Sequence, residues 1–223
     1  MFSNAFLIVW NDVSSATEYE YRRWHRVEHM PERLAIPGFM LGRRYADLSA
    51  AKYRFLTIYE TASTDVFSSA PYRASLASPT PWTTRMSAQM TNFVRRVCRT
   101  AASASNAVGG AVATFHFRDA GEADRLVRMV CELDGVTGAH VGVVDEAATG
   151  ARRDEMQLRS RDGIDPFDAV LIVEGDDRAA LARLNAALID CIAQCAAGKP
   201  AFSQHYDLAL VFHPTHTSAT GQG

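Results

Sequence analysis

The stretch Tyr53-Arg54-Phe55-Leu56-Thr57-Ile58-Tyr59-Glu60-Thr61 decides the fold of this chain, because both of its alternating faces are largely apolar. Such a pattern predicts a β-strand that is covered on both sides. We expect Leu56 and Ile58 to face helices, and the aromatic face that includes Tyr59 to pack on another sheet. The prediction is therefore two sheets packed face to face around a partly aromatic cavity.

The elements on either side of this strand give the first half of the chain a βαββαβ order. Periodicity predicts further strands at residues 5–11, 39–47 and 92–99, a helix at 15–30, and a proline-broken helical region that ends near residue 89. Ser15-Ala16-Thr17-Glu18 has the pattern of a capping box at the start of the first helix. Pro31 should end that helix, because proline lacks the N–H group that a continuing helix needs.

The same order returns in the second half, with predicted strands at 111–118, 135–145, 168–174 and 203–212 and helices at 121–133 and 178–197. The sequence therefore predicts an α+β protein, a tandem duplication of ferredoxin-like βαββαβ repeats whose sheets pack as in a dimeric α/β barrel. The first repeat spans 1–100, a small polar linker 101–110, the degenerate second repeat 111–213 and a disordered tail 214–223. Residues 146–166 have no counterpart in the first repeat, and so long a polar loop is either a lid or disordered.

Composition excludes several classes of protein. The 223 residues are 48% hydrophobic and 22% charged, as in globular proteins, and no apolar run is long enough to span a membrane. Four cysteines in apolar segments favour a reducing, cytoplasmic setting, and no His or Cys neighbour completes a metal site with Cys191 and Cys195. Residues 1–105 hold 13 Lys and Arg against 8 Asp and Glu. This excess is too small and scattered for nucleic acid, but it suits a small anionic ligand.

Candidate catalytic residues lie together near the end of the first predicted helix. His25 and His29 are one turn apart on one side of it, with Glu28 beside them. Histidines titrate near neutral pH, so this group is suited to acid–base catalysis. His25-Arg26-Val27-Glu28-His29 also matches the H-x-x-E-H zinc-protease pattern. We reject that interpretation, because Pro31 ends the helix and no third ligand is evident.

Each candidate also has a structural alternative. His29 can cap the helix carbonyls and complement the helix dipole, and His25 can be a packing or surface residue. Glu28 can pair with Arg26 or Arg33 on a solvated face.

Four further residues are candidates for binding a substrate. Arg43 and Tyr45 alternate with Phe39 and so should share one face of their strand. If that face lines the cavity, Arg43 can hold a carboxylate; otherwise it is an ordinary edge-strand charge. Tyr59 belongs to the predicted aromatic lining. Trp82 is either a lid over the cavity or a core plug for its loop.

A helix ending in Trp24-x-x-x-Glu28-His29-x-Pro31, followed by Leu34-x-x-Pro37-Gly38-Phe39 and a strand, resembles the EthD-like branch of the dimeric α/β barrel superfamily. The resemblance covers residues 5–99, and Pro79-Thr80-Pro81-Trp82-Thr83 resembles a two-repeat subgroup without an established reaction. It implies a single site in the first half, with His29 as the acid–base group. The superfamily includes cyclases, monooxygenases and haem proteins, so the fold does not define the reaction.

Four hypotheses of function remain open on the sequence, of which the fourth is a purely structural role. The first is a cofactor-free isomerase, lyase, cyclase or decarboxylase that acts on a small aromatic or unsaturated acid. The second is a carrier that binds such a ligand without chemistry. The third, a haem protein, ranks below both. The duplication supplies internally what single-repeat relatives obtain by pairing, so the chain is expected to be a monomer or a homodimer.

Overall fold

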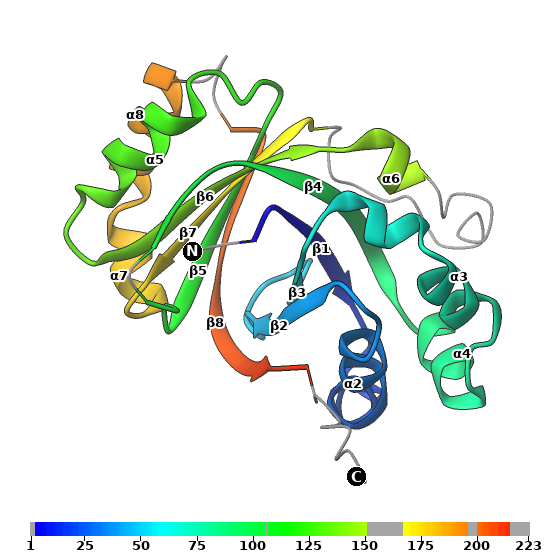
Figure 1. Cartoon of the computed structure of the whole chain (residues 1–223). Helices are drawn as coiled ribbons and strands as arrows, with labels where there is room; N and C mark the ends of the chain where they lie inside the picture. Colours follow the sequence, from blue (N-terminus) through cyan, green and yellow to red (C-terminus); the bar gives the residue numbers. More distant parts are fainter. Residues whose placement is uncertain (1–2, 106, 151–166, 196–199, 215–223) are drawn as a thin grey trace, which may run out of the picture.

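A computed structural model describes residues 3–105, 107–150, 167–195 and 200–214 and places their strands in one closed barrel (Figure 1). The order around the barrel is β1-β3-β2-β8-β5-β7-β6-β4, and every neighbouring pair is antiparallel. The strands are β1 (Ala5–Asp12), β2 (Phe39–Ala46), β3 (Phe55–Thr61), β4 (Thr91–Ser105), β5 (Ala111–Phe117), β6 (Val136–Val144), β7 (Ala169–Gly175) and β8 (Phe202–Phe212).

Helices cover the outside of the barrel in two groups, on opposite flanks (Figure 1). The first half contributes α1 (Glu18–Trp24), the π-helix η1 (His25–His29), α2 (Met30–Leu34), the 3-10 helix η2 (Thr64–Ser68), α3 (Ala70–Ala77) and α4 (Pro81–Ala88). The second half contributes α5 (Ala123–Cys131), α6 (Glu146–Gly150), α7 (Arg178–Arg183) and α8 (Asn185–Cys195). Both halves follow the predicted βαββαβ order, and the predicted α+β fold class is confirmed. None of the described helices is both long and apolar enough to cross a membrane.

The last strand of each half joins the two halves. β4 pairs with β1 through Arg99 and then with β6 as far as Ser105. β8 pairs with β5 in its own half and with β2 in the other. Residues 101–105, predicted as part of a linker, are therefore strand. The physical reason is closure, because a shorter β4 would leave the backbone donors and acceptors of β6 unpaired at an open edge.

The described side chains inside the barrel form a buried, largely apolar cluster. Leu56 and Ile58 point into it beside Trp10, whereas Tyr59 packs outside with the residues of α2. The predicted faces of β3 are thus reversed. Both faces of this strand are apolar, so alternation alone does not identify the inner one.

The outer face of the second half is filled by its helices. Phe115 and Phe117 of β5 pack with Leu126 of α5 and with Leu188 and Ile192 of α8. The four cysteines are free thiols.

Two predicted segments, the loop 146–166 and the tail 214–223, lie mostly outside the described residues, which do not include 151–166 and 215–223. The start of the first of them forms α6. Its Thr149 hydroxyl accepts a hydrogen bond from the Val97 N–H of β4 at 3.0 Å, which holds this helix on the first half.

Candidate functional site

The first helix does not end at Pro31, contrary to the prediction. The Met30 N–H donates to the carbonyl of His25, five residues back, so η1 adds a wider turn between α1 and α2. Pro31 then stands in the first turn of α2, where its missing N–H is not needed. The predicted capping box does not form either, since Thr17 is the N-cap and its side chain makes no capping hydrogen bond. Single π-turns of this kind are frequent at functional sites.

His25 is buried beneath this turn. Its ring lies 5.6 Å from that of Tyr21, and its Nε2 is 3.4 Å from the Thr57 hydroxyl of β3. Burial, with a further contribution from the charge of Arg44, lowers the pKa of His25 to about 3. The imidazole is therefore neutral throughout the physiological range.

His29 is half-buried and stands one π-turn further along. Its ring stacks on Trp24 at 4.5 Å between centroids and lies 5.6 Å from the ring of His25. The two predicted catalytic histidines are thus neighbours in space.

Both histidines line one cavity, of about 50 Å³, between this helical segment and the outer face of the barrel. We call it the η1 cleft. Its other polar lining residues include Asn11, Tyr21, Arg33, Thr57, Tyr59, Tyr72, Thr83, Ser87 and Arg95. A second cavity, of about 200 Å³, lies beside α3 and shares Tyr72 and Arg95 with the cleft.

Two buried arginines in the cleft were not predicted as site residues. Arg33 is 4% exposed, donates to the Ser75 hydroxyl and lies 5.7 Å from the ring centre of Tyr72. Arg95 is 5% exposed and donates at 3.3 Å both to the Thr149 carbonyl and to the Tyr72 hydroxyl. Within the described residues neither has a carboxylate partner. The position of Arg33 one turn after His29 was the signal available in the sequence.

Glu28 lies against α4 and does not line the cleft. Its Oε1 accepts hydrogen bonds from Trp24 Nε1 at 3.2 Å, from the Thr80 hydroxyl at 2.6 Å and from the Thr83 hydroxyl at 2.9 Å. Thr80 is also the N-cap of α4. Glu28 therefore clamps the start of α4 to the first helix.

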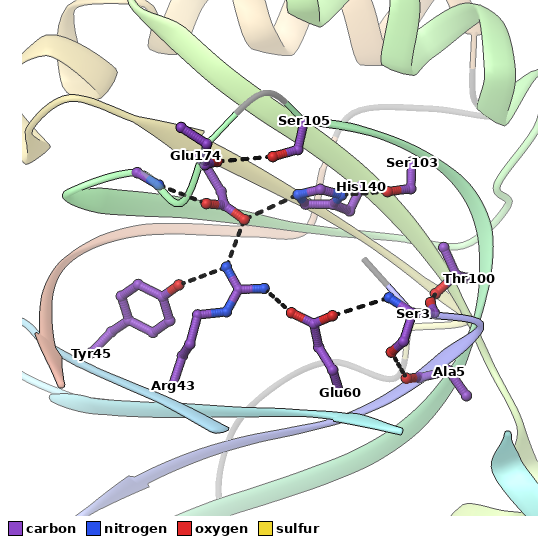
Figure 2. A network of polar contacts seen from close by, with 12 residues as sticks. Ser3, Ala5, Arg43, Tyr45, Glu60, Thr100, Ser103, Ser105, His140 and Glu174 are labelled. Atoms are coloured by element: carbon purple, nitrogen blue, oxygen red, sulfur yellow. Dashed lines mark hydrogen bonds and ion pairs between the residues drawn. The ribbon is translucent and has the colours of Figure 1, made fainter. Parts of the chain in front are cut away.

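Arg43 and Tyr45 lie inside the barrel (Figure 2), and neither lines the η1 cleft that holds His25 and His29. Arg43 donates to Glu174 of β7 at 2.7 Å, to Glu60 of β3 and to the Tyr45 hydroxyl at 3.3 Å. Because two carboxylates hold its guanidinium, Arg43 is not an anchor for a ligand in the η1 cleft. A register shift between Phe39 and Leu41 explains the error, since it places Phe39 with the helices and Arg43 and Tyr45 inside.

The network around Arg43 continues into the second half. Glu174 also accepts from the Gly109 N–H at 2.7 Å and contacts His140 Nε2 at 3.1 Å. Burial raises the pKa of Glu174, but these hydrogen bonds and the charge of Arg43 outweigh it and lower the pKa to about 2. A carboxylate accepts only, so His140 Nε2 carries the proton and its Nδ1 accepts from Ser103 at 2.8 Å.

The remaining predicted binding residues divide between cleft and core. Tyr59 lines the η1 cleft. Trp82 is half-buried and packs with the cluster of Tyr21 and Trp24, and the guanidinium of Arg23 lies 5.4 Å from its ring. This packing agrees with the alternative in which Trp82 plugs the core beneath its loop. No three His, Cys, Asp or Glu side chains of the described ranges are grouped so as to hold a metal ion.

No protein-family model matches this chain, and no curated protein matches its sequence. Solved structures match over almost its whole length. An anthrone oxidase-like protein aligns with a TM-score of 0.60 at 11% identity, covering 98% of this chain and 96% of its own. A candidate monooxygenase from Fusobacterium nucleatum aligns at 0.58 and 14%, covering 96% of each chain. A heme-binding protein from Thermus thermophilus aligns at 0.56 and 9%, covering 94% and 92%.

The closed eight-stranded barrel and these full-length likenesses define the fold class. The chain is an α+β protein with the fold of the dimeric α/β barrel, ferredoxin-like proteins, and both sheets belong to one chain.

One of these neighbours binds heme by its name, but the histidine site of this chain does not fit that group. The η1 cleft, at about 50 Å³, is far smaller than a porphyrin. The corresponding space of the second half is filled by Phe115, Phe117, Leu126 and Leu188. We therefore derive no step through haem.

Proposed function

We propose that this protein is a small-molecule enzyme that moves a proton on a small aromatic or unsaturated acid bound in the η1 cleft. The observation that carries the proposal is the placement of His25 and His29 in one cleft with Arg33 and Arg95, two buried arginines that no described carboxylate pairs with. Guanidinium groups recognise carboxylates through paired hydrogen bonds, so the cleft combines an anion anchor with imidazole chemistry.

The two histidines take different roles in this proposal. A general acid or base works best when its pKa lies near the operating pH. The pKa of His25, lowered to about 3 mainly by burial, makes it a poor proton acceptor. His29, half-buried beside it, is the proton-transfer group. His25 stays neutral and positions the pair through its contact with Thr57.

Arg33 and Arg95 replace Arg43 as the proposed anchor for the acid group. Both contact Tyr72, one over its ring and the other at its hydroxyl. Tyr72 and Arg95 line both cavities and form the wall between them, with Arg33 on the side of the cleft. A ligand of more than a few atoms needs this wall to shift. The two cavities of about 50 and 200 Å³ would then merge toward the roughly 300 Å³ at which small-molecule sites begin.

The class of reaction follows from proton abstraction. Isomerisation, elimination, cyclisation and decarboxylation without a cofactor can all use an acid–base imidazole beside an anchored acid. The resemblance of the Trp24 to Phe39 motif to the EthD-like branch supports the same site. The neighbours named as an anthrone oxidase-like protein and a candidate monooxygenase add dioxygen as a co-substrate to test. In that case a carbanion left by an acidic CH2 group reacts with O2 to give a carbonyl and one water.

A binding screen followed by a turnover assay tests the proposal. Small aromatic acids, lactones and anthrone are screened for a rise in melting temperature, which reports a ligand that binds the native state. Compounds that bind are then incubated with protein in D2O, with and without dioxygen, and followed by NMR. We expect deuterium incorporation or product with the wild type and with His213→Gln, an exposed histidine control.

The variants separate catalysis from binding. His29→Gln should retain the thermal shift but lose about 10²-fold or more of the rate. Arg95→Met should lose the thermal shift, whereas Arg125→Met, on the exposed face of α5, should not. A ligand that binds wild-type protein but is never converted would identify a carrier instead. Unchanged turnover in His29→Gln would overturn the assigned role of His29.

A further inference from the structure

A second and larger groove lies along the first helix and shares no lining residue with the η1 cleft. Its volume is about 660 Å³, and it is lined by residues of α1 and η1, by Arg44 of β2, and by Ala209 and Leu210 of β8. We call it the Arg44 groove. Its volume falls within the range of small-molecule sites.

The Arg44 groove carries positive charge that the described side chains do not neutralise. Its walls hold Arg22, Arg23, Arg26 and Arg44 against the single carboxylate of Glu18. That carboxylate is already engaged by Arg54 at 2.6 Å and by the half-exposed Arg22 at 3.3 Å. Among the residues that the structure describes, Arg26 has no carboxylate partner.

Arg44 is the unusual member of this group, because it is only 5% exposed. Its Nη1 donates to the Arg22 carbonyl at 3.1 Å, and no acidic side chain of the described ranges pairs with it. Burial, together with the charges of Arg22 and Arg26, lowers its pKa. A buried charge without a counter-charge is costly, so proteins rarely retain one unless an ion or ligand compensates it.

We propose that the Arg44 groove binds a small molecule through a phosphate group that lies on Arg44, between Arg22 and Arg26. Three guanidinium groups that line one groove suit a dianion with several acceptor oxygens better than a single carboxylate. The ring of Tyr19, 82% exposed at the same groove, provides a flat surface for the rest of the ligand. The proposal does not depend on the function of the η1 cleft.

Titration of the full-length protein with inorganic phosphate and with pyrophosphate tests this inference, followed by melting temperature and by 31P line width. Sodium chloride at matched ionic strength is the control for the screening of charges by salt. We expect a saturable rise in melting temperature for the wild type and for the α5 variant Arg125→Met. Arg44→Met should weaken binding about tenfold or more, because it removes the central charged hydrogen bonds. Arg44→Lys, which keeps the charge without the planar fork, should be intermediate.

Arg44→Met is expected to fold, since it replaces a buried charge with an apolar side chain. If Arg44→Met does not fold, the exposed variant Arg26→Gln tests the inference instead. Its affinity for phosphate should be several-fold lower than that of the wild type. The inference is wrong if phosphate acts no better than chloride on the wild type. It is also wrong if the folded Arg44 variant, or in its absence Arg26→Gln, binds phosphate as tightly as the wild type.

Discussion

Glu28 shows at the scale of a single residue how a carboxylate beside two histidines can belong to the scaffold. Its spacing from His25 and His29 is what acid–base catalysis would require, and that spacing led to its prediction as a catalytic residue. One of its oxygens, however, already accepts three hydrogen bonds from Trp24, Thr80 and Thr83. The threonines lie more than fifty positions away in the sequence, so their convergence on Glu28 is not visible before the chain is folded.

Replacing Glu28 tests the clamp. We expect Glu28→Ala to lower the free energy of unfolding by about 1–3 kcal/mol, because buried donors lose their acceptor. Chemical denaturation measures the change, with Glu122→Ala, at the exposed N-cap of α5, as the control. A variant as stable as wild type that has lost turnover on an identified substrate would instead return Glu28 to the catalytic group.

His25 leads to a prediction about pH. Its pKa is about 3 in the folded protein, against an ordinary value of 6.5 for histidine. Below pH 6.5 the unfolded chain therefore binds a proton that the folded chain refuses, and stability falls as the pH drops. We expect a contribution of about 1.4 kcal/mol per pH unit between pH 6.5 and 3.

The free energy of unfolding of the wild type and of His25→Gln, measured from about pH 7 to about pH 4, gives this contribution as a difference in slope. NMR signals of the His25 ring should also stay constant over that range. Parallel slopes, or a His25 titration near pH 6.5, would contradict the prediction.

At the scale of elements, the sequence predicts which segments form strands and helices far better than which way they face. Alternation and turn residues place all eight strands within a few residues, apart from the extension of β4 to Ser105. Which face of a strand points into the barrel depends on features that alternation does not reveal. A single register shift in β2 separates Phe39 from Arg43, and β3 is apolar on both sides. The two histidines of the cleft were therefore predictable from their spacing within one helix. Arg95 was not, because it lies on β4, far from them in the sequence.

The π-turn of η1 gives the element-scale prediction. A π-turn amounts to one extra residue in an α-helix, so deletion of the exposed Val27 should restore continuous α-helix from α1 to α2. The barrel should still form, because the apolar faces of α1 and α2 keep their phase. His25 and His29 should then lie three instead of four positions apart, which changes the spacing of their two rings in the cleft.

We expect the Val27 deletion to keep its circular dichroism spectrum and cooperative melting but to lose the thermal shift with any ligand of the η1 cleft. Val27→Ala, which keeps the π-turn, is the control. Retention of ligand binding by the deletion variant would show that the turn is not required for the site.

The whole molecule is held together by contacts between residues that no local pattern connects. Arg43 and Glu174 are 131 positions apart and meet inside the barrel, where Glu60 and His140 complete the network (Figure 2). Long β4 and β8, each paired with a strand of the other half, close the same barrel. Backbone closure and buried charge pairing thus both oppose the separate unfolding of either half.

Glu174→Gln tests this coupling, because Glu174 belongs to the second half while all three tryptophans, Trp10, Trp24 and Trp82, belong to the first. Loss of the carboxylate leaves part of the charge of Arg43 uncompensated, and we expect a loss of roughly 3 kcal/mol in the free energy of unfolding. Tryptophan fluorescence and circular dichroism should shift together if the barrel is one cooperative unit.

The fall in stability at acid pH provides an independent measurement of the contribution of Glu174. The pKa of Glu174 is about 2 in the folded protein, against an ordinary value of 4.5 for glutamate, so its contribution is complete above pH 4.5 and is lost as the pH falls toward 2. Glu174→Gln should therefore lose stability less steeply than wild type over that interval, and Glu122→Gln should behave as wild type. If the fluorescence midpoint stays in place while the dichroism midpoint moves, the two halves unfold separately. The Arg43 network would then stabilise the second half alone.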